Sequence, residues 1–256
     1  MGGIMMPYLG SMGQDGYVPP NVLPNLSLWY NGSAAYTTVN GASTADFDVS
    51  ATLVNGSSIG SWLDLQGVGG PANYFNGGGG NKPTYTTGIQ NGLGAVTYAS
   101  ASKQNLDINQ NMSSWIQNKT AMTVFVLARP TSLPASIVPL TVTETSLGIW
   151  WNGTNWSVGS SATSYGTVTV TNDTTKFHIY GFVFDGSQST AAAKLTFRYD
   201  KAVKSLTLTG SGDTTTGAPG YLFFGGDARS SGTFSAKFMS GYIGEVLIWT
   251  RALTAS

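Results

Sequence analysis

The chain has 256 residues, a length that suits one large β domain, because sandwiches and barrels of this size fold as single units. Twelve basic residues balance twelve acidic ones and charged residues make up only 9%, so no strong field attracts nucleic acid or an anionic membrane surface. The chain contains no cysteine, which excludes disulfides.

The first 25 residues are rich in Gly, Pro and Met and predict an irregular arm. Pro7, Pro19, Pro20 and Pro24 cannot donate to a β ladder, and no hydrophobic period is present. The segment also lacks the positive n-region and apolar run of a secretory signal. Its apolar side chains would be costly to leave in water, so we expect them to dock on a neighbouring subunit, with a frayed end as the alternative. The residues of this attachment arm are Ile4, Met5, Met6, Tyr8 and Leu9.

After the arm, short apolar runs separated by turn residues predict β-strands. The predicted strands are residues 26–30, 96–99, 122–128, 149–158 as a hairpin, 177–184, 194–200 and 221–224. In the hairpin, Asn152 and Gly153 supply the positive φ angles of a tight turn. In the strand at 194–200, alternation directs Leu195, Phe197 and Tyr199 inward. Many turn-bounded strands with almost no helical period predict a sandwich or a barrel.

The last predicted strand, residues 241–249, is apolar on both faces. Strict alternation gives two sets, with Ile243, Leu247 and Trp249 on one face and Tyr242, Val246 and Ile248 on the other. A sandwich strand normally leaves one face in water, so we expect the second face to be covered. We expect Leu247 and Trp249 to face the core between the sheets. The Tyr242 face is then covered by the amino-terminal half or by another chain.

Several short motifs occur in a fixed order along residues 26–253. They are Leu26/Leu28/Trp29, Trp62/Asp64/Gly67, Pro83/Tyr85, Asn91/Gly92, Val96/Tyr98 and Glu245/Val246/Ile248. In this order they resemble the laminin-G-like, concanavalin-A-like family. The resemblance implies an all-β, antiparallel jelly-roll sandwich over residues 26–256, after an arm of residues 1–25.

One hairpin departs from the family pattern. Residues 199–202 read Tyr-Asp-Lys-Ala where the family often has Tyr-Val-Asp-Gly, so this turn lacks its glycine. The family includes glycan-binding modules, domains of large surface proteins and phage structural proteins. Membership therefore implies a fold more firmly than a function.

Catalytic residues are scarce in the chain. Glycoside hydrolysis needs two carboxylates about 5–10 Å apart, and the only glutamates, Glu144 and Glu245, are distant in sequence. We expect Glu245 to pair with a backbone amide or a basic side chain. His178 is the only histidine and is expected to be structural, so with no cysteine the Ser/His and Cys/His nucleophile systems are excluded. We therefore expect a protein that is not an enzyme.

Asp46 and Asp48 form the only close acidic pair. Three interpretations stay open for them: a catalytic pair, a ligand pair for a cation such as Ca²⁺, or a solvated loop. Calcium takes six to eight oxygen ligands, and no single loop here offers more than two carboxylates. Apart from calcium at this pair, no cofactor is expected.

Aromatic residues flank the predicted hairpin turn. Trp150 and Trp151 point to opposite faces of their strand, so one of them is expected in the core. Aromatic faces stack on sugar rings as on other flat apolar surfaces. The glycan-binding candidates are Trp151, Trp156 and Tyr165, with core packing or subunit contact as the alternative.

Two functions fit these observations better than a third, a glycoside hydrolase or lyase. The first is a non-enzymatic phage virion structural or decoration protein, assembled in the host cytoplasm, that attaches to capsid, tail or fibre subunits through the arm. The second is a secreted or surface carbohydrate-binding lectin module in an extracellular setting. Both are compatible with glycan binding and with a homo-oligomer. No nucleic-acid or membrane partner is expected, because no stretch approaches the roughly 20 apolar residues of a membrane span.

Overall fold

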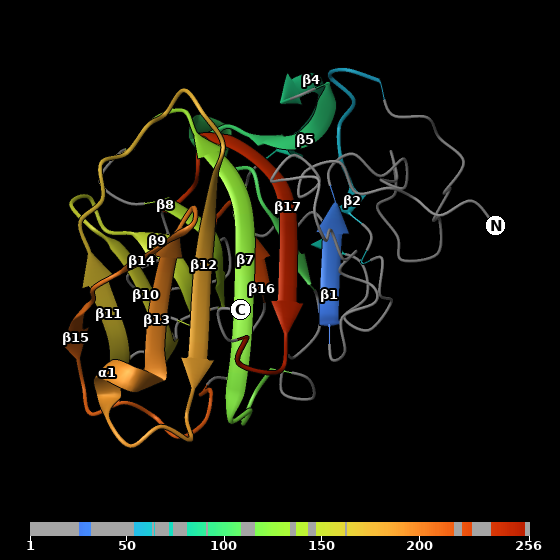
Figure 1. Ribbon diagram of the computed structural model, residues 1–256. Helices are drawn as coiled ribbons and strands as arrows, with labels where there is room; N and C mark the ends of the chain where they lie inside the picture. The colour runs from blue at the N-terminus through green and yellow to red at the C-terminus, as the bar shows by residue number, and fades with distance from the viewer. Residues whose placement is uncertain are drawn as a thin grey trace, which may run out of the picture.

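Two antiparallel β-sheets pack face to face in the computed structural model (Figure 1). The structure describes residues 26–31, 54–62, 64, 72–73, 81–90, 92–108, 116–133, 137–142, 147–161, 163–217, 222–226 and 237–253. The predicted arm, residues 1–25, lies outside these ranges. The expected all-β jelly-roll sandwich is confirmed.

The strands of each sheet are hydrogen-bonded in a fixed spatial order. The eight-stranded sheet contains, in order, β14 (Ala202–Lys204), β13 (Leu195–Tyr199), β12 (His178–Asp185), β7 (Ala121–Pro130), β17 (Gly241–Trp249), β5 (Leu93–Tyr98) and β4 (Thr84–Gln90), with β1 (Leu26–Asn31) also paired to β17. The nine-stranded sheet contains β15 (Thr207–Thr209), β11 (Ser164–Val168), β10 (Trp156–Ser161), β9 (Gly148–Trp151), β8 (Ile137–Val142), β16 (Leu222–Phe224), β6 (Leu106–Ile108), β3 (Ala72–Asn73) and β2 (Ser61–Trp62).

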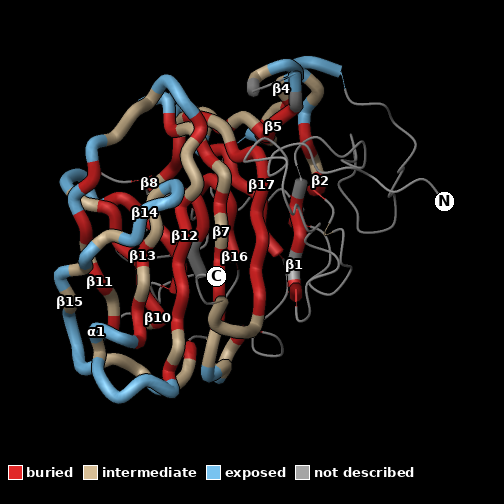
Figure 2. The backbone as a smooth tube through the Cα atoms, in the orientation of Figure 1, coloured by how far each residue is buried: buried red, intermediate tan, exposed pale blue. Residues whose placement is uncertain are grey.

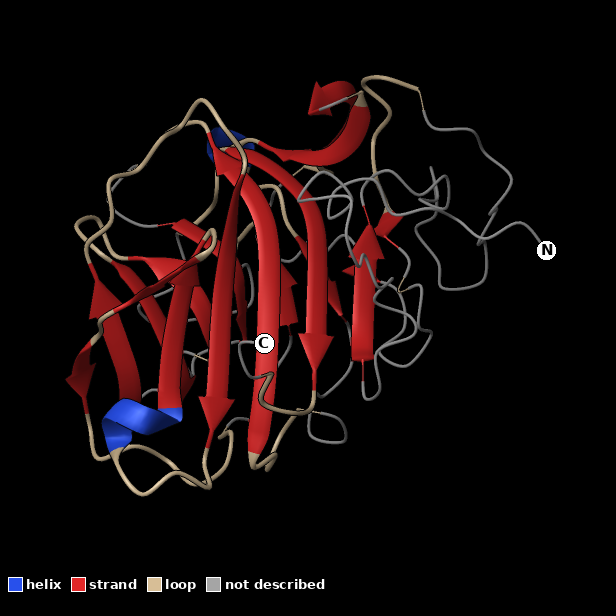
Figure 3. Ribbon diagram, in the orientation of Figure 1, coloured by secondary structure: helices blue, strands red, loops and turns tan. Residues whose placement is uncertain are grey.

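Helix is rare in the part of the chain that the structure describes (Figure 3). The helix α1 spans Ala191–Lys194 and begins after Thr190, whose hydroxyl accepts a hydrogen bond from the Ala193 amide at 3.3 Å. A 3₁₀ turn covers Ser100–Ser102. Neither of these described helices has the length and apolar character that crossing a membrane requires.

The main core fills the space between the sheets (Figure 2). On β12 and β13 the antiparallel register brings Tyr180 opposite Tyr199 and Phe182 opposite Phe197. Phe182 and Phe197 are fully buried, and Leu195 belongs to the same core cluster. The predicted inward face of this strand is therefore confirmed.

The predicted orientation of the last strand is wrong, because β17 contains a bulge. The pairing of β17 with β7 shifts between Ile243 and Glu245. Ile243 faces the core, and beyond the shift Val246 and Ile248 face it too. Leu247 and Trp249 lie on the outer face instead of between the sheets. One extra residue in a strand sends every later side chain to the other face.

The outer face of β17 is nevertheless covered, as a doubly apolar strand requires. Leu247 and Trp249 cluster with side chains from β1, from β7 and from the C-terminal segment, namely Leu26, Trp29, Phe125 and Leu253. The C-terminal segment is fastened by Thr123, whose hydroxyl donates to the Arg251 carbonyl at 2.8 Å and accepts from the Leu253 amide at 2.9 Å. The amino-terminal strand β1 thus supplies part of the expected cover.

Candidate functional site

The hairpin of β9 and β10 decides which tryptophans are available to a ligand. The predicted turn is confirmed only at Gly153, which has a φ of 93°. Asn152 does not have a positive φ; its side chain instead accepts hydrogen bonds from the amides of Thr154 and Asn155. The register places Trp151 opposite Trp156. The two indoles therefore lie on the same face of the sheet.

That shared face is the core. Trp156 is 0% exposed and Trp151 is 7% exposed. The Trp156 ring lies 4.4 Å from the ring of Tyr180 on the opposite sheet, and its Nε1 donates to Asn172 Oδ1 at 2.7 Å. Buried rings offer no open face to a sugar, so the structure does not place Trp151 and Trp156 in an exposed platform. The rings pack between the sheets because alternation in β9 and β10 points them inward.

Trp150 and Tyr165 lie on the outer face of the same sheet. Their ring centroids are 6.0 Å apart, and the planes are tilted by 56°. Trp150 is only 6% exposed, whereas Tyr165 is half-buried. Trp150 therefore supports Tyr165, and Tyr165 is the ring with accessible surface. Of the three sequence-predicted glycan residues, only Tyr165 reaches this face.

A row of hydroxyl groups runs along β11 beside Tyr165. Thr167 is half-buried and Thr169, just beyond the strand, is exposed, whereas the alternate residues Ser164, Gly166 and Val168 are buried. On the neighbouring strand β15, Thr207 pairs with Thr167 and Thr209 pairs with Tyr165, and both threonines are exposed. We call Tyr165, Thr167, Thr169, Thr207 and Thr209 the hydroxyl face.

Inward contacts hold β15 beside β11. Leu206 packs so closely on Gly166 that a Cβ at Gly166 would lie 2.9 Å from Leu206 Cδ1. Gly210, which follows β15, has a φ of +87°, and a Cβ there would lie 2.0 Å from the Thr163 carbonyl oxygen. Only glycine permits that approach without a shift of the backbone. These two glycines fix the edge of the hydroxyl face.

The hydroxyl face carries no charge. The strands β9, β10, β11 and β15 contain no Asp, Glu, Lys, Arg or His. Each threonine hydroxyl offers one donor and two acceptor positions, and the tyrosine adds a phenolic hydroxyl. The arrangement can hydrogen-bond a neutral, hydroxyl-rich ligand and can stack against it through Tyr165.

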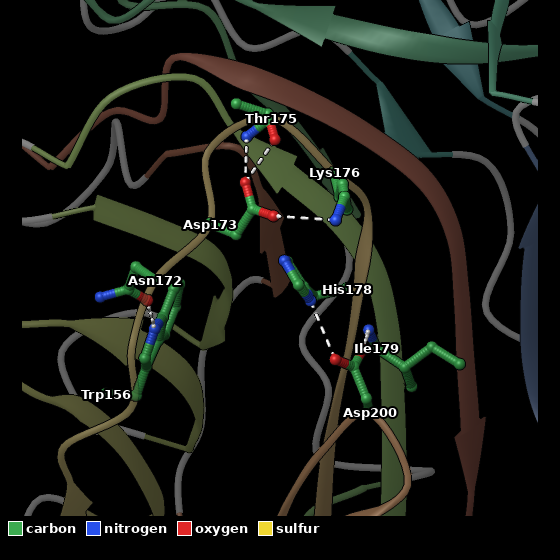
Figure 4. A network of polar contacts seen from close by, with 8 residues as sticks. All are labelled: Trp156, Asn172, Asp173, Thr175, Lys176, His178, Ile179 and Asp200. Carbon is green, nitrogen blue, oxygen red and sulfur yellow. Dashed lines mark hydrogen bonds and ion pairs between the residues drawn. The ribbon is translucent and has the colours of Figure 1, made fainter.

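His178 anchors a separate polar network at one end of the sandwich (Figure 4). Its Nδ1 lies 2.9 Å from Asp200 Oδ2, and its ring stacks on Tyr199 with the centroids 4.7 Å apart. Burial, followed by the nearby Asp200 carboxylate, raises the pKa of Tyr199 to about 12. Asp200 also accepts a hydrogen bond from the Ile179 amide at 3.0 Å. These contacts join β12 to the β13–β14 turn, which agrees with the structural role expected for His178.

In the β13–β14 turn, Asp200 occupies the left-handed position that a glycine would normally take. Its φ is 55°, in the left-handed region that Asp and Asn adopt more readily than other non-glycine residues. The carboxylate bonds to His178 and Ile179 hold it there. The missing glycine is therefore replaced by an aspartate that is fixed through its side chain.

We expect Asp200→Ala to lower the free energy of unfolding by about 1–2 kcal/mol, because alanine keeps the left-handed strain and loses both bonds. Asp200→Gly removes the strain and should lose less stability, and Asp200→Asn should stay closest to the parent. Urea unfolding followed by circular dichroism measures the series. Equal stability of the alanine and asparagine variants would contradict this account of the turn.

Hydrogen bonds between its own residues organise the loop before β12. Asp173 Oδ1 accepts from the Thr175 amide at 2.8 Å and from the Thr175 hydroxyl at 2.5 Å. These hydrogen bonds lower the pKa of Asp173, with smaller contributions from Lys176 and His178. Lys176 Nζ lies 3.7 Å from Asp173 Oδ2 and is largely exposed. The loop is thus organised internally by Asp173.

The remaining sequence-predicted residues fall into two groups. Asp46, Asp48, Glu144 and the arm lie outside the described residues. Glu245 is buried on the outer face of β17, where its carboxylate accepts a hydrogen bond from Trp29 Nε1 at 3.0 Å. Among the residues that the structure describes, no three His, Cys, Asp or Glu side chains gather in a way that could hold a metal ion.

Comparisons with known proteins find similar folds among solved structures but identify no family for this chain. No model of a known protein family matches the sequence, and no curated protein matches it. Domain 4 of AbnA, a GH43 extracellular arabinanase from Geobacillus stearothermophilus solved with arabinotriose, is similar over 90% of this chain and 94% of that domain, with 14% identity and a TM-score of 0.51.

Two other solved structures are less similar. A Trypanosoma rangeli sialidase in complex with 2,3-difluorosialic acid matches 91% of this chain with 16% identity and a TM-score of 0.48, and this chain spans 32% of the sialidase. A heptameric SAP-like pentraxin from Limulus polyphemus matches 59% of this chain and 71% of its own, with 15% identity and a TM-score of 0.42. At such identities the likeness shows the fold alone.

Proposed function

We propose that this chain is a non-catalytic carbohydrate-binding module that holds neutral glycans on the hydroxyl face. The observation that carries the proposal is the position of Tyr165, a ring with accessible surface that is supported by Trp150 and flanked by threonine hydroxyls. Sugars present hydroxyl groups at their edges and C–H groups on their faces. A tyrosine among uncharged hydroxyls complements both kinds of group.

The fold supports this proposal without establishing it. Domain 4 of the arabinanase, which shares the sandwich, was solved with arabinotriose bound. A binding role without hydrolysis is consistent with the absence of any carboxylate on β9, β10, β11 and β15, since glycoside hydrolysis needs two carboxylates about 5–10 Å apart. The lectin-like alternative from the sequence is therefore the function that we favour.

Tyr165→Ala should weaken glycan binding about tenfold or more, which corresponds to the loss of about 1.4 kcal/mol from one stacking contact. Affinity electrophoresis in gels containing soluble arabinan, xylan, galactan or β-glucan measures the effect. Tyr165→Phe keeps the ring and should retain most of the binding. Tyr242→Ala removes a tyrosine from the other sheet and serves as the control.

Two outcomes would contradict this assignment. Unchanged retardation of Tyr165→Ala in a gel that retards the parent protein would place the glycan elsewhere. Failure of the parent protein to bind any of these polysaccharides would count against the proposed function itself. Unfolding curves of each variant should accompany the gels, so that lost binding is separated from lost structure.

The virion role stays a prediction from the sequence. It rests on the arm, residues 1–25, which lies outside the described residues, and the comparisons offer it no support. Attachment to capsid, tail or fibre subunits, a homo-oligomeric state and calcium at Asp46 and Asp48 are predictions of the same kind. The proposed glycan site is compatible with either setting, because a displayed module and a secreted one use the same face.

A further inference from the structure

The hydroxyl face extends in one direction, along the axis of β11. Tyr165, Thr167 and Thr169 occupy successive outward positions, and a strand rises about 3.3 Å per residue, so the row is about 13 Å long. On β15, Thr207 and Thr209 form a second row beside the first, and neighbouring strands lie about 4.8 Å apart. The donors and acceptors therefore form two parallel rows.

The rows lie on an open surface and not in a pocket. Thr169, Thr207 and Thr209 are exposed. A cavity of about 320 Å³ does lie beside β15, but it is lined by side chains such as Leu206, Leu208 and Val203. Leu206, just before β15, and Leu208 on β15 pack against the core, whereas Thr207 and Thr209 are exposed. The cavity is therefore separate from the hydroxyl face.

The two rows differ in the hydrogen bonds that their hydroxyl groups already make within the protein. Thr167 Oγ1 donates to the Thr207 carbonyl at 3.4 Å, and Thr169 Oγ1 donates to Asn155 Oδ1 at 2.5 Å. The structure gives the hydroxyls of Thr207 and Thr209 no such bond within the described residues. The hydroxyls of the β15 row can therefore hydrogen-bond a ligand. The pairing of β15 with β11 places these hydroxyls next to Tyr165.

We propose that the ligand is the interior of an extended, unbranched, neutral polysaccharide that lies along β11 and β15, and not a terminal sugar. This inference rests on the proposed function and names its ligand class. A single sugar ring on Tyr165 reaches Thr209, which is paired with Tyr165, but leaves Thr207 and Thr169 unused. A chain of several units covers both rows. A terminal residue would instead require a closed pocket around the chain end.

The test is a length series measured by isothermal titration calorimetry. The probes are linear oligosaccharides of two to six units of arabinose, xylose, galactose and β-linked glucose. In the series that binds, affinity should rise at least tenfold from the disaccharide to the hexasaccharide. The double variant Thr207→Val/Thr209→Val should lose at least fivefold in hexasaccharide affinity, because valine keeps the β-branched shape and removes only the hydroxyls.

Controls separate the possible failures. Thr196→Val changes a threonine on β13 of the other sheet and should leave the series unchanged. Binding that is independent of chain length, or unaffected by the double variant, would overturn the extended-chain inference while leaving the proposed function intact. Absence of binding to every oligosaccharide and to the polysaccharides would overturn both. Size-exclusion chromatography of the double variant checks that the valines at this sheet edge cause no self-association.

Discussion

Trp156→Ala is expected to destabilise the fold by about 3–5 kcal/mol, the cost of truncating a large buried aromatic side chain. The indole is 0% exposed, packs 4.4 Å from Tyr180 and 5.7 Å from Trp151, and bonds Asn172. Its removal opens a cavity between the sheets and releases the loop that leads to β12. The loss should appear as a shift of the urea midpoint with little change in slope.

The same variant distinguishes a core role from a ligand role. Below its unfolding midpoint, Trp156→Ala should still bind glycan, whereas Tyr165→Ala should lose binding and keep its unfolding free energy within about 1 kcal/mol of the parent. The reverse pattern, in which Trp156→Ala is stable but fails to bind, would restore the sequence-based hypothesis of an exposed tryptophan platform.

The sequence predicted the fold class because turn-bounded alternation separates the two faces of a strand. The spacing of Leu195 and Phe197 predicts that both point inward, and the two side chains belong to the core cluster between the sheets. The same reasoning failed on β17, where the pairing shifts after Ile243. Gly244 stands at that shift, and a glycine inside a strand is a known signal for a bulge. The glycine alone does not show that the side chains after it change from one face of the strand to the other.

The candidate site was predicted less completely, because a strand's pattern does not say which face is inside. Alternation places Trp150 and Trp151 on opposite faces of their strand but does not say which of the two faces the core. The pairing of Trp151 with Trp156 and the contact with Tyr180 settle it. The threonine rows at 167–169 and 207–209 were visible in the sequence as Thr-x-Thr repeats. Only the register shows that the two repeats lie side by side.

Glu245 is the one described glutamate, so its role bears on the question of catalysis. It lies on the buried outer face of β17, beside β1, and its carboxylate is 3.0 Å from Trp29 Nε1. Trp29 is fixed in turn by its amide, which donates to Asp64 at 2.9 Å. These contacts join β1 to β17 on the covered outer face of the sheet, where Glu245 has a structural partner.

We expect Glu245→Ala to lower the free energy of unfolding by about 2–3 kcal/mol, because a hydrogen bond to a charged group is worth about 1.5–3 kcal/mol and the buried indole N–H of Trp29 loses this acceptor. Glu245→Gln keeps a side-chain carbonyl that can accept from the indole, so its loss should be clearly smaller. Denaturant unfolding measures both variants, and reducing-sugar assays on the polysaccharides above run in parallel. Hydrolysis by the parent protein that Glu245→Gln abolishes, with stability unchanged, would instead make Glu245 a catalytic residue.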